Sequence, residues 1–184
     1  MKAIALLLAA VAAWQVPGYF FPHRLRLDCP SDACVLGRWI ACADTPVRER
    51  PGTSQWVVGQ VAKGTRFPVV GAELLTLEPG TVRVTRDVEQ AGRLFKTGET
   101  LVLLGHVGEG FYFVSTQGRS GMIEVFWPWK RQGGVNEAAE LVRDAVTERW
   151  MQTTVAGKPG WVLDDGTVLS PAGQVEPLKC PAGQ

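Results

Sequence analysis

The sequence predicts a mainly β protein built from two small β-barrels, one inserted within the other, together with one amphipathic helix. The first observation is that 21 glycines and 12 prolines separate short runs rich in Val and Leu, as is typical of short strands joined by turns. The second is an internal repeat that is split in two, and the third is one segment with helical spacing. With 184 residues, 46% of them hydrophobic, the chain can bury one core or two small ones.

The charge balance argues against a nucleic-acid partner. The chain has 19 Lys and Arg residues against 18 Asp and Glu residues, whereas proteins that bind the phosphate backbone carry a clustered excess of Lys and Arg. Only two histidines are present, which leaves little for His-based catalysis. We expect no cofactor, and no metal site either, because one would need closer Cys-x-x-Cys spacing and more histidines.

The first residues predict an export signal. Met1 and Lys2 give a positive start, residues 4–13 form an apolar run, and small residues at 10–13 offer a cleavage site. The run is too short to span a bilayer. We therefore expect residues 1–13 to be a signal peptide and the mature chain to be periplasmic or secreted. No stable membrane insertion is expected after cleavage.

Four cysteines follow the signal, and in an exported protein an even number predicts disulfides. We favour Cys42 with Cys180, which ties the start of the folded body to its end. That leaves Cys29 with Cys34, closing a small loop. The alternative joins Cys29 to Cys180 and Cys34 to Cys42.

Strands are expected throughout the body of the chain. Residues 14–45 are predicted to be a Cys-containing N-terminal segment with a short strand or turn near 35–43. From residue 46 the sequence changes to short apolar runs between glycine-containing turns. Strands are predicted at 56–58, 67–70, 81–84, 101–104, 111–114, 122–125 and 161–163.

One segment has a different periodicity. Asn136 can cap a helix, and acidic residues follow in the first turn. Apolar residues fall on one face at helical spacing, at Ala138, Leu141, Val142, Ala145 and Val146. The pattern predicts a helix over 136–149 that packs its apolar face on the core. A membrane-surface helix would need a strongly basic face, which this segment does not have.

The internal repeat has two parts. Residues 61–71 match 95–105, and residues 111–123 match 150–162, with glycine falling on glycine in both matches. Each matched segment has the pattern of a strand, a glycine turn and a second strand.

The distribution of the repeat predicts nesting. Residues 81–125 hold both halves of the unit, whereas 46–73 holds only the front half and the segment after 150 only the back half. One barrel would then comprise 46–73 and 150–170, interrupted by an inserted barrel and connector over 74–135, with a C-terminal tail at 171–184. Insertion is reasonable where the ends of the inserted domain lie close together. Two barrels in tandem are the alternative.

Three motifs follow one another in a recognisable order: residues 47–54 (Val-Arg-x-Arg-Pro-Gly-Thr-Ser), residues 57–65, and residues 157–162 (Gly-Lys-Pro-Gly-Trp-Val) preceded by Trp150. This order resembles the bacterial Src homology 3 (SH3-like, SH3b) domains. The inserted unit departs from the pattern, with Met122 where Trp is usual. The resemblance implies two SH3-like β-barrels in a non-enzymatic binding module of the bacterial cell envelope. Such a module would recognise peptidoglycan or a peptide or protein partner.

The candidate ligand-binding residues are aromatic. Trp127 and Trp129 flank a proline in a glycine-flanked connector and are followed by basic residues; the alternative for this stretch is an interface between the two barrels. Tyr112, Trp56 and Trp150 are further candidates, and the alternative for Trp56 and Trp150 is a place in the core.

Two other functions are considered. A small envelope hydrolase would need a free cysteine near His23 or His106, yet all four cysteines have plausible disulfide partners. The carboxylate pair Asp164 and Asp165 follows a strand and is typical of a turn, so no catalytic residue is predicted. An inhibitor or partner of a secreted enzyme would use the same surface as a binding module.

Overall fold

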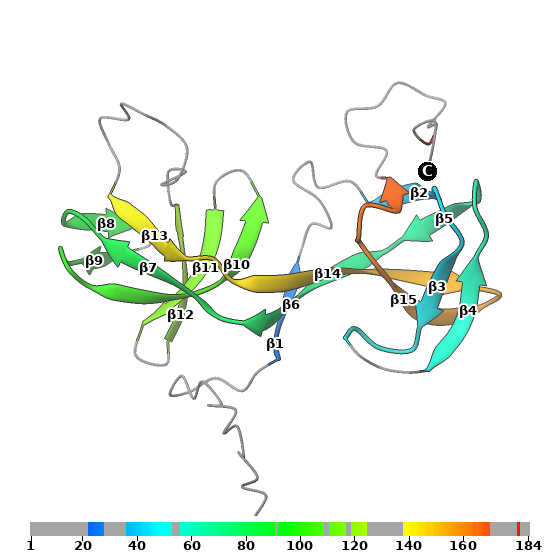
Figure 1. Cartoon of the computed structure of the whole chain (residues 1–184), viewed down its shortest axis with the longest axis horizontal. Helices are drawn as coiled ribbons and strands as arrows, with labels where there is room; N and C mark the ends of the chain where they lie inside the picture. The colour runs from blue at the N-terminus through cyan, green and yellow to red at the C-terminus, as the bar shows by residue number, and fades with distance from the viewer. Residues whose placement is uncertain are drawn as a thin grey trace, which may run out of the picture.

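The structure, a computed structural model, describes residues 22–27, 36–52, 56–90, 92–108, 111–116, 119–124, 138–169 and 180. These residues form strands β1 to β16 and contain no helix, so the mainly β class is confirmed. The strands gather in two lobes at opposite ends of an elongated molecule (Figure 1).

The first lobe combines a six-stranded and a three-stranded sheet. The six-stranded sheet has the order β1 (His23–Leu27), β6 (Gly71–Glu78), β14 (Val146–Val155), β15 (Lys158–Leu163), β3 (Thr45–Arg48) and β4 (Val57–Val61). The three-stranded sheet has the order β16 (Val168–Leu169), β2 (Gly37–Ala41) and β5 (Arg66–Val69). Trp39, Phe67 and Met151 are buried in a common core contributed by both sheets.

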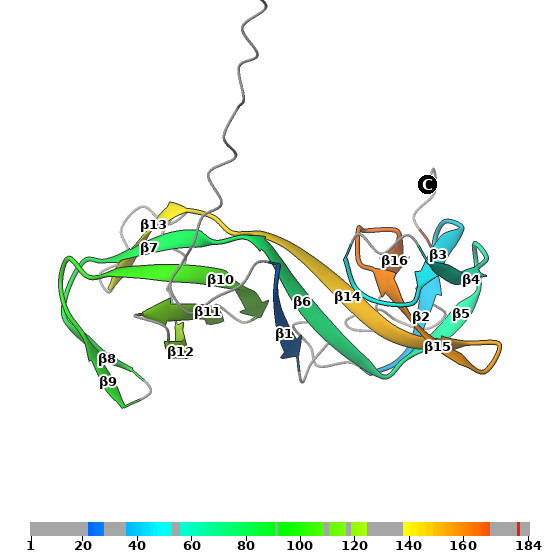
Figure 2. The ribbon, with the colours of Figure 1, turned by 90° about the horizontal axis from the view of Figure 1, so that it is seen from below.

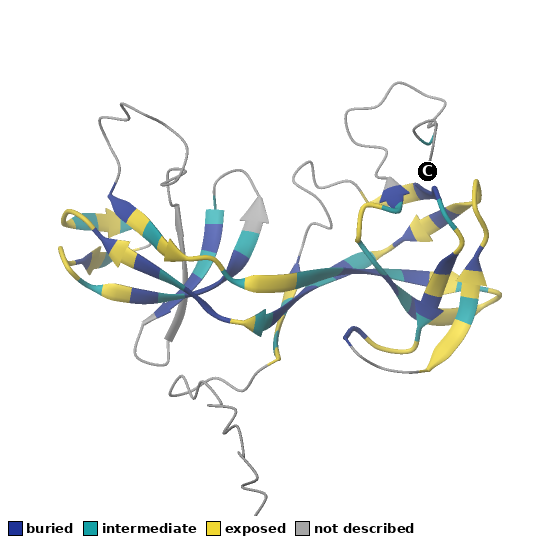
Figure 3. Cartoon of the chain, in the orientation of Figure 1, coloured by how far each residue is buried: buried dark blue, intermediate teal, exposed yellow. Residues whose placement is uncertain are grey.

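The second lobe is built from a five-stranded sheet and a hairpin. The sheet has the order β12 (Arg119–Glu124), β11 (Phe111–Thr116), β10 (Thr100–Gly108), β7 (Gly80–Val84) and β13 (Ala139–Arg143). The hairpin pairs β8 (Val88–Gln90) with β9 (Arg93–Phe95). Val82, Phe95 and Leu103 belong to its buried core. Figure 3 shows buried residues alternating with exposed ones along many of the strands, as period-two side-chain geometry requires.

A two-stranded ribbon joins the lobes. β6 pairs with β14 in the first lobe, and the same two stretches of chain continue as β7 and β13, which pair in the second (Figure 2). Gly80 lies where the ribbon passes between the lobes, and a Cβ there would come within 2.6 Å of the backbone nitrogen of Ala145. The Arg143 guanidinium donates to the carbonyl oxygen of Pro79 at 2.8 Å. Phe113 of β11 also packs against the core of the first lobe, so the two lobes are in direct contact.

The predicted strands are confirmed, whereas the predicted helix is wrong. All seven predicted runs overlap observed strands, namely β4, β5, β7, β10, β11, β12 and β15. In place of the helix over 136–149, the described residues form β13 and the beginning of β14. Ala139 is buried and Glu140 exposed, and both pair with β7. Long-range pairing with β6 and β7 therefore overrides the helical spacing.

The segments expected to share one barrel contribute strands to both sheets of the first lobe. β15 pairs with β3 at Trp161 and Arg48, and β14 pairs with β6, while residues 80–143 supply the strands of the second lobe. No sheet among the described strands closes on itself, so closed barrels are not seen there. The barrel boundaries stay a prediction, since β6 runs without a break across residue 74.

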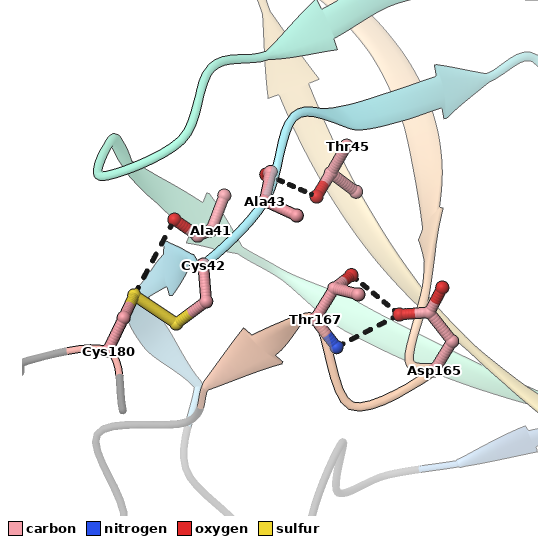
Figure 4. Close-up of a disulfide and its surroundings, with 7 residues drawn as sticks. All are labelled: Ala41, Cys42, Ala43, Thr45, Asp165, Thr167 and Cys180. Atoms are coloured by element: carbon pink, nitrogen blue, oxygen red, sulfur yellow. Dashed lines mark hydrogen bonds between the residues drawn. A yellow bond between two sulfur atoms is a disulfide. The ribbon is translucent and has the colours of Figure 1, made fainter. Parts of the chain in front are cut away.

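Cys42 and Cys180 form a disulfide, the pairing that the sequence favours (Figure 4). Cys42 is fully buried beside Ile40, and the Sγ of Cys180 lies 3.8 Å from the carbonyl oxygen of Ala41. The bond joins residues 138 positions apart and so fixes Cys180 to the strand that carries the first lobe's buried Trp39. Cys29, Cys34 and the predicted signal peptide lie outside the described residues.

Candidate binding pocket

The loop between β3 and β4 supports the candidate site. The backbone N–H of Glu49 donates to the carbonyl oxygen of Trp56 at 3.0 Å, which closes the base of the loop. Gly52 has a φ of +94°, a backbone conformation that residues with a side chain rarely adopt, and a Cβ there would lie 3.1 Å from Cδ2 of Leu75. Pro51 fixes its own φ, so the Pro-Gly pair directs the loop onto β6.

A pocket of about 260 Å³ lies between this loop, β1 and β6. The described residues that line it are Pro22, Arg24, Arg50, Pro51, Gly52, Leu75 and Leu77. Leu75 is buried and Leu77 half-buried, whereas both arginines are exposed, so the interior is apolar and the rim is cationic. Pockets that enclose drug-sized ligands span roughly 300–1,000 Å³; this one is smaller and suits a group the size of one amino-acid residue.

The two arginines of the rim differ in their contacts. The Arg24 guanidinium donates to the carbonyl oxygen of Pro51 at 3.1 Å and lies 3.7 Å from Oε2 of Glu73. It therefore ties β1 both to the loop and to β6. The side chain of Arg50, in contrast, has no hydrogen bond or ion pair within the described part of the chain.

The residues that line the pocket suit the binding of an anionic ligand group better than they suit catalysis. Among the described residues, no carboxylate lines the pocket, and the residues that do are Pro, Arg, Gly and Leu, none of which serves as a nucleophile or general base at neutral pH. Guanidinium groups bind carboxylates through paired, charge-assisted hydrogen bonds. The pocket can thus hold an apolar group and an anion side by side.

Trp56 lies at the other end of the same loop and is strongly exposed, at 73% of its surface. Val57 and Val58 follow it and are exposed as well, and β4 is the edge strand of its sheet. This predicted binding residue is therefore accessible, and tryptophan is enriched among the residues that contribute most to protein interfaces.

Tyr112 and Trp150 are buried instead. Trp150 is 2% exposed in β14 and donates through Nε1 to Glu148 at 2.9 Å. The ring of Tyr112 packs against His106 with 4.8 Å between centroids, and burial raises the pKa of its hydroxyl to about 12. Neither ring is accessible to a ligand in this structure. Trp127 and Trp129 lie outside the described residues.

Three of the residues weighed for a hydrolase, namely Cys42, Cys180 and Asp165, have structural roles. Cys42 and Cys180 are joined to each other. Asp165 accepts hydrogen bonds from the backbone N–H and hydroxyl of Thr167 (Figure 4), so its turn assignment is confirmed. Burial raises the pKa of the neighbouring Asp164 above its ordinary value. Within the described ranges, no group of three or more potential ligands could hold a metal ion.

The pocket was not predicted as a site. Arg50, Pro51 and Gly52 belong to the motif that carries the resemblance to SH3-like domains, and that motif is the signal that could have pointed to them. Leu75 and Leu77 offered no such signal, because their place at the pocket depends on pairing between β1 and β6.

Comparison with known proteins identifies no relative. No protein-family model matches the sequence, and neither the curated proteins nor the solved structures give a significant match. Among the described residues, no helix is long and apolar enough to cross a membrane.

Proposed function

We propose that this protein is an exported, non-enzymatic binding module of the bacterial cell envelope that recognises a peptide segment, either in peptidoglycan or in a protein partner. The observation that carries the proposal is the pocket formed by the β3–β4 loop with β1 and β6, because its described residues give it an apolar interior and a cationic rim and include no catalytic group. Stiff loop residues and few polar groups suit binding without chemistry.

The proposal includes a relationship to the bacterial SH3-like domains. It is supported by the order of the motifs at 47–54, 57–65 and 157–162, whose strands β3, β4 and β15 are neighbours in one sheet. Export to the periplasm or exterior is supported by the signal-like first residues and by the Cys42–Cys180 disulfide, since disulfides persist in oxidising compartments.

The test fills the pocket and asks whether binding is lost. Leu77→Trp places a larger side chain in the pocket, and Val142→Trp makes the same kind of change on β13 at an exposed position of the second lobe. Each protein would be incubated with purified peptidoglycan and, separately, selected against a phage-displayed peptide library. Circular dichroism would verify that both variants fold.

We expect the unmodified protein and Val142→Trp to retain peptidoglycan, or to enrich a peptide family, above a control protein of similar charge. Leu77→Trp should reduce that binding at least about tenfold, since it removes burial worth about 1.4 kcal/mol or more. Binding that survives Leu77→Trp unchanged, or none in either arm, overturns the proposal.

A further inference from the structure

We infer that the pocket recognises a carboxylate that lies next to an apolar side chain, with Arg50 as the residue that binds the carboxylate. The inference rests on the proposed function and specifies its ligand. It follows from the different states of the two arginines at the rim and from the shape and chemistry of the interior.

Arg24 is already committed to the protein. Its guanidinium contacts the carbonyl oxygen of Pro51 and the carboxylate of Glu73, which lies in β6 opposite Arg26 of β1. Its charge is already offset by Glu73 and one of its N–H donors is used by Pro51, so Arg24 is less available to a ligand anion than Arg50 is. Arg24 therefore has a structural role, since its hydrogen bond holds the β3–β4 loop against β1.

Arg50 is the guanidinium of this pocket that remains available. It stands next to Pro51, whose carbonyl group is held by Arg24, and close to Gly52, whose backbone lies against Leu75. The backbone that carries Arg50 is thus fixed from two sides, while its side chain is exposed and without a polar partner within the described residues. Because the backbone is already fixed and the guanidinium has no partner among the described residues, less conformational entropy is lost when Arg50 binds an anion.

The charge of the site matches a carboxylate better than a phosphate. One free guanidinium balances one negative charge, whereas a phosphate monoester carries nearly two at neutral pH and is usually bound by several donors. The buried Leu75 and half-buried Leu77 supply an apolar surface beside that cation. An apolar residue at the end of a peptide chain offers both groups together, since its side chain and terminal carboxylate share one Cα. An acidic side chain beside an apolar residue offers the same chemistry from within a chain.

The experiment compares three probes with the full mature chain. They are acetyl-Gly-Gly-Leu with a free carboxylate, the same peptide with a C-terminal amide, and acetyl-Gly-Glu-Leu as the amide. Dissociation constants would be measured by titration of the 15N-labelled protein, following the backbone amide of Gly52. The variant Arg50→Gln removes the charge, and Arg38→Gln is the matched control, because Arg38 is an exposed arginine on β2 that does not line the pocket.

We expect the free acid to bind about tenfold more tightly than its amide, as expected for one charge-assisted hydrogen-bonded pair. Arg50→Gln should abolish this difference and Arg38→Gln should keep it. Tighter binding of the glutamate peptide than of the plain amide, again dependent on Arg50, identifies an internal acidic residue as a source of the carboxylate.

Equal binding of all three peptides overturns the carboxylate inference but leaves a peptide-binding pocket intact. The carboxylate inference is also overturned, and the pocket retained, if none of the three peptides binds although Leu77→Trp still reduces binding of peptidoglycan or of displayed peptides. An acid-over-amide preference that persists in Arg50→Gln also overturns the inference, because another group must then hold the carboxylate. Arg50 is exposed, so its replacement leaves the fold in place for each measurement.

Discussion

Single atoms decide the fit between the strands of the first lobe. Gly160 of β15 is buried, and a Cβ at this position would overlap Cγ1 of Val47 and lie 3.1 Å from the carbonyl oxygen of Arg48. Val47 is itself fully buried. The absence of a side chain at Gly160 therefore allows β15 to lie against β3, next to the loop that bears the pocket.

The replacement Gly160→Ala should destabilise the protein by about 1–3 kcal/mol, the usual cost of overpacking a close-packed core. The control is Gly59→Ala on β4, where a Cβ would make only an ordinary contact at 3.5 Å with Val155 and should change the free energy of unfolding by less than about 0.5 kcal/mol. Urea denaturation followed by tryptophan fluorescence measures both. Equal stabilities of the two variants would contradict the close contact at Gly160.

Residue type alone could not distinguish accessible from buried aromatic residues. Trp56 and Trp150 are both tryptophans followed by an apolar residue, yet Trp56 precedes an edge strand and is exposed. Trp150 lies in the middle of β14, a strand paired on both sides, and is buried. Their difference depends on strand order, which pairs residues far apart in the sequence. The candidate site was predictable only where a local motif, Arg50-Pro51-Gly52, happens to form its wall.

At the scale of elements, Asp87 joins the two ends of the β8–β9 hairpin that lie away from its turn, because it precedes β8 and bonds to residues that follow β9. The Asp87 carboxylate accepts from the backbone N–H of Thr97 at 2.8 Å, from the Thr97 hydroxyl and from Nζ of Lys96 at 3.0 Å. The backbone hydrogen bond from Thr97, followed by the bond from Lys96, lowers the pKa of Asp87 to about 2. Val88 pairs with Phe95 immediately inside this clasp.

Because the folded-state pKa of Asp87 is depressed, its contribution to stability is present above the unfolded-state pKa near about 4 and is lost as the pH falls from there to about 2. We expect the midpoint of urea unfolding to fall with acid less steeply in Asp87→Asn than in the unmodified protein over this window. A carboxyl-carbon NMR titration gives the pKa directly. Lys96→Met should raise the pKa only part of the way, since the Thr97 backbone bond remains. An Asp87 pKa near its ordinary value would contradict the clasp.

The wrong prediction of a helix over 136–149 and the correct predictions of strands elsewhere both rest on local sequence signals. Strands such as β11 and β15 were predicted because β-branched and aromatic residues lie between glycine turns, which is a local signal. β13 carries Ala, Glu and Leu, residues that favour helices locally. They form a strand because β7 offers an unpaired edge, and β14 extends along β6. That pairing is long-range, and no local window contains it.

At the scale of the molecule, the first lobe is assembled from two separated parts of the chain. Its sheets contain strands up to β6 and strands from β14 onward, and the intervening residues form the second lobe. The repeat predicted that residues 46–73 and the segment after 150 belong to one unit, because each holds only half of the repeated pattern. It did not predict that β6 and β7 continue as one ribbon with β13 and β14, or that Phe113 packs against the first core, since neither feature repeats.

The Cys42–Cys180 disulfide closes a loop that includes nearly the whole body of the chain. In the chain-entropy treatment, closing so long a loop restricts the unfolded state strongly, and loss of a native disulfide costs about 2–5 kcal/mol. The double replacement Cys42→Ala/Cys180→Ala should therefore lower the free energy of unfolding by that amount. Alanine is the appropriate substitute because Cys42 is fully buried beside Ile40, where a serine hydroxyl would add its own cost of burial.

Urea denaturation of the double variant measures the effect, and the single variants Cys42→Ala and Cys180→Ala supply the control. Each single variant already breaks the bond, so the second replacement should change stability little beyond the loss of one small buried contact. The pocket lies between the β3–β4 loop, β1 and β6, and neither cysteine lines it, so peptide binding should persist in the folded double variant. A loss of less than about 1 kcal/mol in the double variant would contradict this account, because the chain ends would then be held by the strand pairing of the first lobe alone.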